Sequence, residues 1–118
     1  MSKIKIIRIG FIGLGDQGAP MAQAISEAGF ELHVWARRPQ TFEAIAGTPH
    51  IVEKTLQALA ANCDVVCLCL TDDKDIVNLL NSGLRDGLRT GTVLVNHGTG
   101  DPGESRRLAA ELLALMRF

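Results

Sequence analysis

The segment Gly13-Leu14-Gly15-Asp16-Gln17-Gly18 predicts chemistry more clearly than any other part of this sequence. Its first glycine allows a tight turn, its second lets a pyrophosphate approach the backbone, and its third lets a helix pack closely on a strand. The amino end of that helix would offer free N–H groups and a partial positive charge to phosphates. The segment therefore predicts a dinucleotide-binding loop, with all six residues as candidate cofactor contacts. Asp16 would repel a pyrophosphate, so we expect its carboxylate to face solvent. A purely structural strand–helix turn is the alternative.

The adjacent arginines Arg37 and Arg38 follow the second expected strand. A domain that binds NAD usually has an acid there, about 20 residues after the glycines, which grips the ribose hydroxyls. The nearest carboxylate, Glu31, stands at the start of the strand, roughly 16 Å from Ala36 at ~3.3 Å per residue. Guanidinium groups bind phosphate oxygens bidentately, so the pair predicts NADP(H) as the cofactor. The alternative is that Arg37 and Arg38 belong to a solvent-exposed loop that binds no phosphate.

The histidines and cysteines give weaker indications of function. His97 is a candidate general acid–base group, with a polar role at a strand end as the alternative; we expect His33 and His50 to be structural. The odd number of cysteines, Cys63, Cys67 and Cys69, favours reduced thiols in a cytoplasmic protein over a disulfide framework. Their spacing is not that of a zinc site, so we expect no metal.

Apolar patterning predicts strands over 4–12, 31–35, 50–52, 64–70 and 92–95. Helices are expected between them, with Gly29 and Gly47 ending the first two. Their expected buried stripes are Gly18, Met21, Ala22, Ile25 and Ala28; Phe42, Ile45 and Ala46; Leu56, Leu59, Ala60 and Cys63; Ile76, Val77, Leu79 and Leu80; and, in a helix starting near Asp101-Pro102, Leu108, Leu112 and Leu115.

This alternation predicts an α/β fold of the Rossmann type, with a doubly wound parallel sheet of about five strands covered by helices on both faces. The length of 118 residues suits one domain. With a net charge of −1, the chain has no general electrostatic attraction for nucleic acid or an acidic membrane surface, and no apolar run approaches the ~20 residues of a membrane helix. We therefore expect neither partner.

The residues Gly10-Phe11-Ile12-Gly13-Leu14-Gly15, followed by Gly18, Pro20, Met21 and Ala22, resemble the start of the β-hydroxyacid dehydrogenase family. This family includes 3-hydroxyisobutyrate, tartronate semialdehyde and 6-phosphogluconate dehydrogenases, and imine reductases are relatives. The resemblance extends to about Arg107. It implies hydride transfer between NADP and a hydroxyacid or related substrate.

Several positions depart from the family pattern. Gln17 stands where methionine is usual, Ala36-Arg37-Arg38 replaces Asn-Arg-Thr, and Leu70-Thr71 replaces a Leu-Pro pair that lines the cofactor. The resemblance makes Leu70 and Thr71 candidate cofactor contacts. Asn96-His97-Gly98-Thr99 replaces Asp-x-Ser-Thr. Only Thr99 is retained there, as a further candidate contact, and the serine hydroxyl used for substrate is lost at Gly98.

The family's catalytic lysine belongs to a helical domain that follows the nucleotide domain. The lysines of this chain, Lys3, Lys5, Lys54 and Lys74, have no matching context. The resemblance therefore implies a dinucleotide-binding domain over residues 1–118, truncated before the last strand of the sheet and that helical domain, with no catalytic residue and no turnover alone. The abundance of apolar residues between Leu112 and Phe118 predicts a homo-oligomer through the final helix. The alternatives are a stand-alone NADP-binding regulatory module, an imine-reductase-type fragment and another nucleotide binder, such as an adenosylmethionine-dependent methyltransferase.

Overall fold

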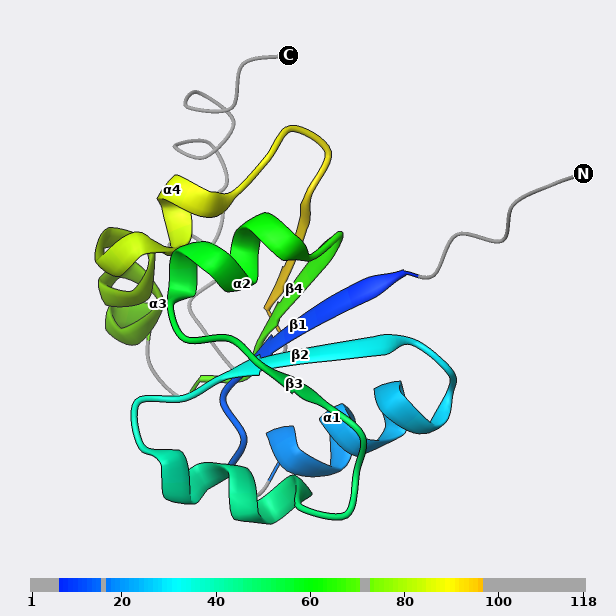
Figure 1. Ribbon diagram of the computed structural model, residues 1–118. Helices are drawn as coiled ribbons and strands as arrows, with labels where there is room; N and C mark the ends of the chain where they lie inside the picture. Colours follow the sequence, from blue (N-terminus) through cyan, green and yellow to red (C-terminus); the bar gives the residue numbers. More distant parts are fainter. Residues whose placement is uncertain (1–6, 16, 71–72, 97–118) are drawn as a thin grey trace, which may run out of the picture.

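The computed structural model describes residues 7–15, 17–70 and 73–96. They form a five-stranded parallel sheet in the order β3-β2-β1-β4-β5 (Figure 1). The strands are β1 (Arg8–Ile12), β2 (Glu31–Trp35), β3 (Ile51–Val52), β4 (Val65–Leu68) and β5 (Val93–Asn96). The predicted doubly wound parallel sheet is thereby confirmed.

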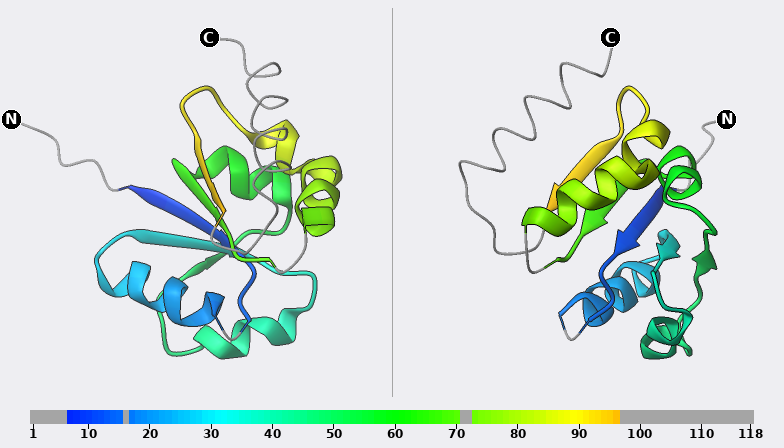
Figure 2. Two further views of the ribbon diagram at one scale, coloured as in Figure 1. Left: turned by 180° about the vertical axis from the view of Figure 1, so that it is seen from behind. Right: turned by 90° about the vertical axis from the view of Figure 1, so that its left-hand side faces the viewer.

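Helices cover both faces of the sheet (Figures 1 and 2). On one face lie α1 (Gly18–Glu27) and the 3-10 helix η1 (Pro39–Ile45). The other face carries α2 (Leu56–Asn62), α3 (Asp73–Leu79), the π-helical turn η2 (Leu80–Leu84) and the short α4 (Arg85–Gly87). The described helices include none long and apolar enough to cross a membrane.

Alternation along the strands divides the core into two clusters, because successive side chains of a strand point to opposite faces. In β1, Phe11 packs on the α1 side and Ile12 on the α2 side. In β4, Cys67 and Val66 divide in the same way, and both are buried. The continuous apolar run of the fourth strand therefore serves both faces, as expected for a strand inside a parallel sheet.

The chain changes direction between β1 and β4. The strands β2 and β3 lie in turn on one side of β1. The chain then crosses back through α2, and β4 and β5 lie in turn on the other side of β1. In open α/β sheets, ligands bind outside the carboxyl ends of the strands at this switch point. The glycine segment follows β1 directly, so the topology places it there.

Some predicted boundaries differ from the structure. Ile7 precedes β1 and is exposed, while residues 4–6 lie outside the described residues. The third strand is only Ile51–Val52, at the edge of the sheet and exposed. Ala28 and Ala46 are exposed at helix ends rather than buried. The helix predicted around 76–80 starts at Asp73 and continues into α4 through a kink at Gly83, whose φ is +119°.

Candidate nucleotide-binding site

A cavity of about 220 Å³ opens at the carboxyl ends of β1, β2 and β4. It brings the glycine segment beside the end of the second strand and the start of α3. Its lining consists of Ile12, Gly13, Leu14, Trp35, Ala36, Arg37, Thr41, Leu70, Asp75 and Leu79. Four of the predicted contacts, Gly13, Leu14, Arg37 and Leu70, therefore meet at one cavity.

Two glycines of the segment are required by the packing of the protein itself. Gly13 has a φ of +103°, and a Cβ placed on it would lie 2.2 Å from the carbonyl oxygen of Cys69. A Cβ on Gly18 would lie 1.7 Å from the carbonyl oxygen of Gly13 and 3.1 Å from the Phe11 ring. Any side chain at either position would push backbone apart, so these glycines hold the turn closed and seat α1 against β1.

Gly15 has no such reason to be glycine. A Cβ built on it would meet no atom within 4 Å, its φ is not positive, and the residue is exposed. The absent side chain therefore leaves open space beside the backbone, next to the amino end of α1. This is the arrangement a phosphate group needs for close approach to peptide N–H groups.

The amino end of α1 has no side-chain cap among the described residues. Its N-cap residue is Gln17, whose exposed side chain makes no capping hydrogen bond, and the first turn contains no acidic residue. Ala19 donates its N–H to the carbonyl of Gly15 over 2.9 Å, while Pro20 has no N–H to satisfy. The positive end of the helix is thus not neutralised by a side chain from the described residues.

The two arginines separate at the end of β2. Arg37 is exposed and lines the cavity. Arg38 is also exposed, but it is the N-cap of η1 and is not among the lining residues. The pair thus places one guanidinium at the cavity and the other just beyond it.

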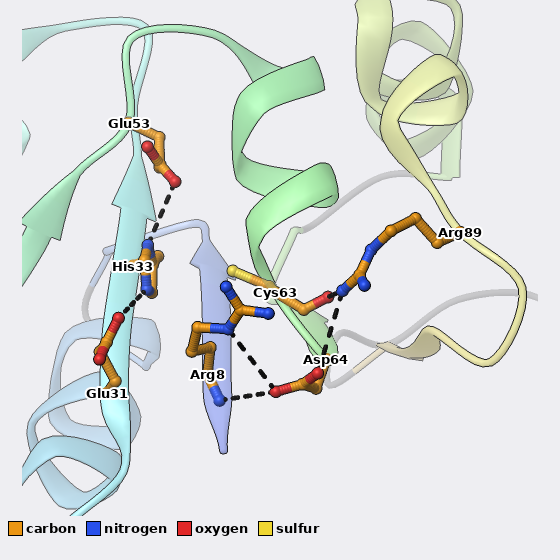
Figure 3. Close-up of polar contacts among 7 residues, drawn as sticks. All are labelled: Arg8, Glu31, His33, Glu53, Cys63, Asp64 and Arg89. Atoms are coloured by element: carbon orange, nitrogen blue, oxygen red, sulfur yellow. Dashed lines mark hydrogen bonds and ion pairs between the residues drawn. The ribbon is translucent and has the colours of Figure 1, made fainter. Parts of the chain in front are cut away.

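The acid nearest to this strand in sequence is engaged elsewhere. The carboxylate of Glu31, the first residue of β2, lies 2.8 Å from Nε2 of His33 (Figure 3). No carboxylate stands at the carboxyl end of β2, where the sequence reads Trp35-Ala36-Arg37. The position that grips ribose hydroxyls in NAD-binding domains therefore has no acid.

Sequence reasoning did not name the other six lining residues as contacts: Ile12, Trp35, Ala36, Thr41, Asp75 and Leu79. Asp75 is half-buried and supplies the only carboxylate among the described lining residues. It precedes Leu79 by four positions, so the two share one face of α3. That spacing was a usable signal, because Leu79 was already expected to face inward. Asp16, Thr71 and Thr99, together with His97 and the final helix, lie outside the described residues.

His33 occupies a buried polar cluster away from the cavity, as expected for a structural residue. Only 5% exposed, it sits between the carboxylates of Glu31 and Glu53, with 3.1 Å between its Nδ1 and Oε2 of Glu53 (Figure 3). Asn62 also donates to Glu53, over 2.8 Å. These bonds join β2 to the segment between β3 and α2 and to the end of α2.

The thiols are free. Cys63 and Cys67 are buried and Cys69 is half-buried. Burial, with a smaller contribution from the nearby carboxylates of Glu53 and Asp64, raises the pKa of Cys63 to about 12. Burial also raises the pKa of Cys67. Neither thiol has the low pKa of a nucleophile.

The comparison with protein families decides the assignment. Residues 8–116 match the model described as the NAD binding domain of 6-phosphogluconate dehydrogenase. The chain belongs to this family of NAD-binding domains. The predicted resemblance is thereby confirmed.

Individual relatives agree with this. Glyoxylate/succinic semialdehyde reductase 2 of Arabidopsis thaliana is 26% identical over 108 residues, covering 90% of the NAD-binding domain described here and 30% of the relative. The mitochondrial 3-hydroxyisobutyrate dehydrogenase of Drosophila melanogaster is 28% identical over 106 residues, covering 90% of this chain and 33% of its own length. Among solved structures, the imine reductase of Streptomyces aurantiacus has a TM-score of 0.83 at 27% identity, covering 92% of this chain and 38% of that one. The chain thus spans about a third of the length of each.

Proposed function

We propose that this NAD-binding domain takes NADP(H) in preference to NAD(H), and that it serves an oxidoreductase which transfers hydride between NADP and a hydroxyacid or a related substrate. The observation that carries the nucleotide proposal is the open backbone at Gly15. The neighbouring glycines, Gly13 and Gly18, are demanded by the fold, whereas Gly15 is free of every packing constraint. A ligand that approaches the backbone explains a glycine at this position.

The cavity residues fit the parts of a dinucleotide. The pyrophosphate would rest against Gly15 and the amino end of α1, whose donors are not capped by a side chain. The apolar lining of Trp35, Leu70 and Leu79 suits the flat faces of a base. The adenosine ribose would then lie toward the end of β2, beside Arg37.

The preference for NADP(H) rests on charge at that end. Arg37 and Arg38 are both exposed, and the printed sequence has no acid between Glu31 and Glu43. A guanidinium forms strong paired hydrogen bonds with phosphate oxygens. A 2′-phosphate therefore gains attraction here, while the unmodified ribose of NAD finds no carboxylate from β2 for its hydroxyls.

The bound nicotinamide would supply the hydride chemistry of the whole protein. The residues of this chain have other tasks: they bind the phosphates, orient the nucleotide along the carboxyl edge of the sheet, and exclude water from the base with the apolar lining of the cavity. We assign no proton transfer to any described residue.

Charge reversal of the arginines tests the cofactor preference. The double variant Arg37→Asp with Arg38→Asp should weaken NADPH binding by about 100-fold, because each charge-assisted hydrogen bond contributes about 1.5–3 kcal/mol. NADH binding should change far less. Isothermal titration calorimetry measures both affinities, and the NADH affinity of the same variant serves as the internal control. Equal loss for both cofactors, or no loss, contradicts the preference.

An imine is a second candidate substrate class, because the chain is 27% identical to the imine reductase of Streptomyces aurantiacus over 92% of its length. Oxidation of NADPH by the protein that contains this domain, with a semialdehyde and with a cyclic imine offered separately, distinguishes the classes. Turnover of the imine alone would replace the hydroxyacid assignment.

A further inference from the structure

We propose that Asp75 recognises the base of the dinucleotide: its carboxylate accepts a hydrogen bond from the exocyclic amino group of adenine and makes the cavity selective for 6-aminopurine nucleotides. This inference rests on the proposed function, because it concerns the same cavity. It adds a specificity-determining residue that comes from α3, outside the glycine segment and outside β2.

The position of Asp75 in the cavity is the first argument. The cavity is lined from two sides. Gly13, Leu14 and Arg37 follow β1 and β2, while Leu70 follows β4, and Asp75 and Leu79 belong to α3. If phosphates occupy the glycine segment and the ribose phosphate lies near Arg37, the wall formed by β4 and α3 is left for the base.

The surroundings of Asp75 are the second argument. Leu70 and Leu79 accompany it in the lining, so Asp75 is the side-chain acceptor that this wall of the cavity offers among the described residues. Within the described part of the chain, Asp75 forms no hydrogen bond or ion pair, and Arg37 is not its partner although both line the cavity. No described residue therefore uses the capacity of this half-buried carboxylate to accept a hydrogen bond.

The chemistry of purines then selects the partner. An ionised carboxylate only accepts hydrogen bonds. Adenine presents an amino group with two donors at its six-position, whereas hypoxanthine presents an oxygen acceptor at the same place. Asp75 attracts the first and repels the second, while both bases offer the same flat faces to Trp35 and Leu79.

The test compares NADPH with reduced nicotinamide hypoxanthine dinucleotide phosphate, which differs only in the base. The wild-type chain should bind NADPH at least tenfold more tightly, since a site built to receive a hydrogen-bonding group rejects an analogue that lacks it. In Asp75→Asn, the side chain both donates and accepts, so the ratio of the two affinities should fall to about one. Calorimetry of binding gives the ratio without any need for turnover.

The ratio also removes a competing effect. Loss of the carboxylate lowers repulsion of the phosphates, but it does so equally for both nucleotides and cancels in the ratio. Asp86→Asn is the matched control, because Asp86 is exposed on α4 and does not line the cavity. This variant should keep the wild-type ratio.

The outcomes separate the two proposals. Equal wild-type affinities for the two nucleotides, or an unchanged ratio in Asp75→Asn, would overturn the role of Asp75 and leave the dinucleotide site standing. An equal loss of both affinities in that variant would also overturn it, because Asp75 would then hold a group that both nucleotides share, such as a ribose hydroxyl. A folded wild-type chain that binds neither nucleotide would overturn the proposed function itself.

Discussion

Replacement of Gly15 by alanine should separate ligand binding from folding. A Cβ at this position meets no protein atom within 4 Å, and the backbone φ is one that alanine adopts without strain. Gly→Ala at such a site stabilises a protein by about 0.4–1 kcal/mol, because the unfolded chain loses conformational freedom. The free energy of unfolding should therefore stay the same or rise slightly.

The affinity for NADPH should fall in the same variant. The new methyl group would occupy the space in which a phosphate oxygen approaches the backbone at the start of α1. Loss of one hydrogen bond to a charged group costs about 1.5–3 kcal/mol, which corresponds to a roughly 10- to 150-fold weaker affinity for NADPH. Isothermal titration calorimetry gives the affinity, and urea denaturation followed by far-ultraviolet circular dichroism gives the stability.

Gly18→Ala provides the contrast and Gly47→Ala the control. A Cβ on Gly18 would lie 1.7 Å from the carbonyl oxygen of Gly13, so backbone must move, and we expect a loss of about 3 kcal/mol or more in stability. Gly47 is also open and unstrained but follows η1 rather than β1, so its alanine variant should leave the NADPH affinity unchanged and shift stability in the same small way as Gly15→Ala. If Gly15→Ala binds NADPH as tightly as wild type, or unfolds as easily as Gly18→Ala, the reasoning is refuted.

Three further predictions concern the rest of the domain. His33→Leu should lower the free energy of unfolding by about 3 kcal/mol in urea denaturation, because it leaves the mostly buried Glu53 carboxylate without its imidazole partner. Stability should fall as pH rises from 9.0 toward about 12, because the unfolded chain releases the Cys63 proton above its ordinary pKa of 9.0 while the folded chain retains it; urea midpoints over this range should fall less steeply in Cys63→Ala. Iodoacetamide should label the half-buried Cys69 in the native protein, and the buried thiols only at the rate of unfolding, as peptide mass spectrometry would reveal.

Each of these has a result that would contradict it. For His33, the control is His50→Gln, since the half-buried His50 contacts the carbonyl of Thr48 and the ring of Phe42 and no carboxylate among the described residues; equal losses would show that the carboxylate cluster is unimportant. An identical alkaline slope in Cys63→Ala would assign the pH effect to other groups. Labelling of Cys63 ahead of Cys69 in folded protein would mean that α2 does not cover it.

The sequence predicted best those features that depend on residues close together in the chain. The bounds of β2, Glu31–Trp35, were predicted as they are found, because an apolar run between Gly29 and the arginines leaves little freedom. The turn after β1 was predicted from Gly13 and Gly18, and both prove to be constrained by backbone contact. The predicted stripe beginning at Leu56 also lies in a helix, α2, which starts at that residue after a Thr55 cap that the sequence analysis did not name.

Features that depend on distant parts of the chain were not predictable. The spacing of Asp75 from Leu79 could have indicated that Asp75 faces inward, but the meeting of this face of α3 with the glycine segment depends on β4 returning beside β1. The bond between His33 and Glu53 joins residues 20 positions apart, and no periodic pattern links them. The continuation of α3 past Leu80 depends on contacts with α2, so the apolar stripe alone ended the helix too early.

One aromatic residue gives this domain an optical property of its own. The sequence contains a single tryptophan and no tyrosine, and that tryptophan, Trp35, lines the cavity. Nearly all of the protein's ultraviolet emission therefore originates at one point on the carboxyl edge of the sheet. A melting curve recorded by emission would report loosening of that edge, and its comparison with a curve recorded by dichroism would reveal whether the edge loosens before the rest of the sheet.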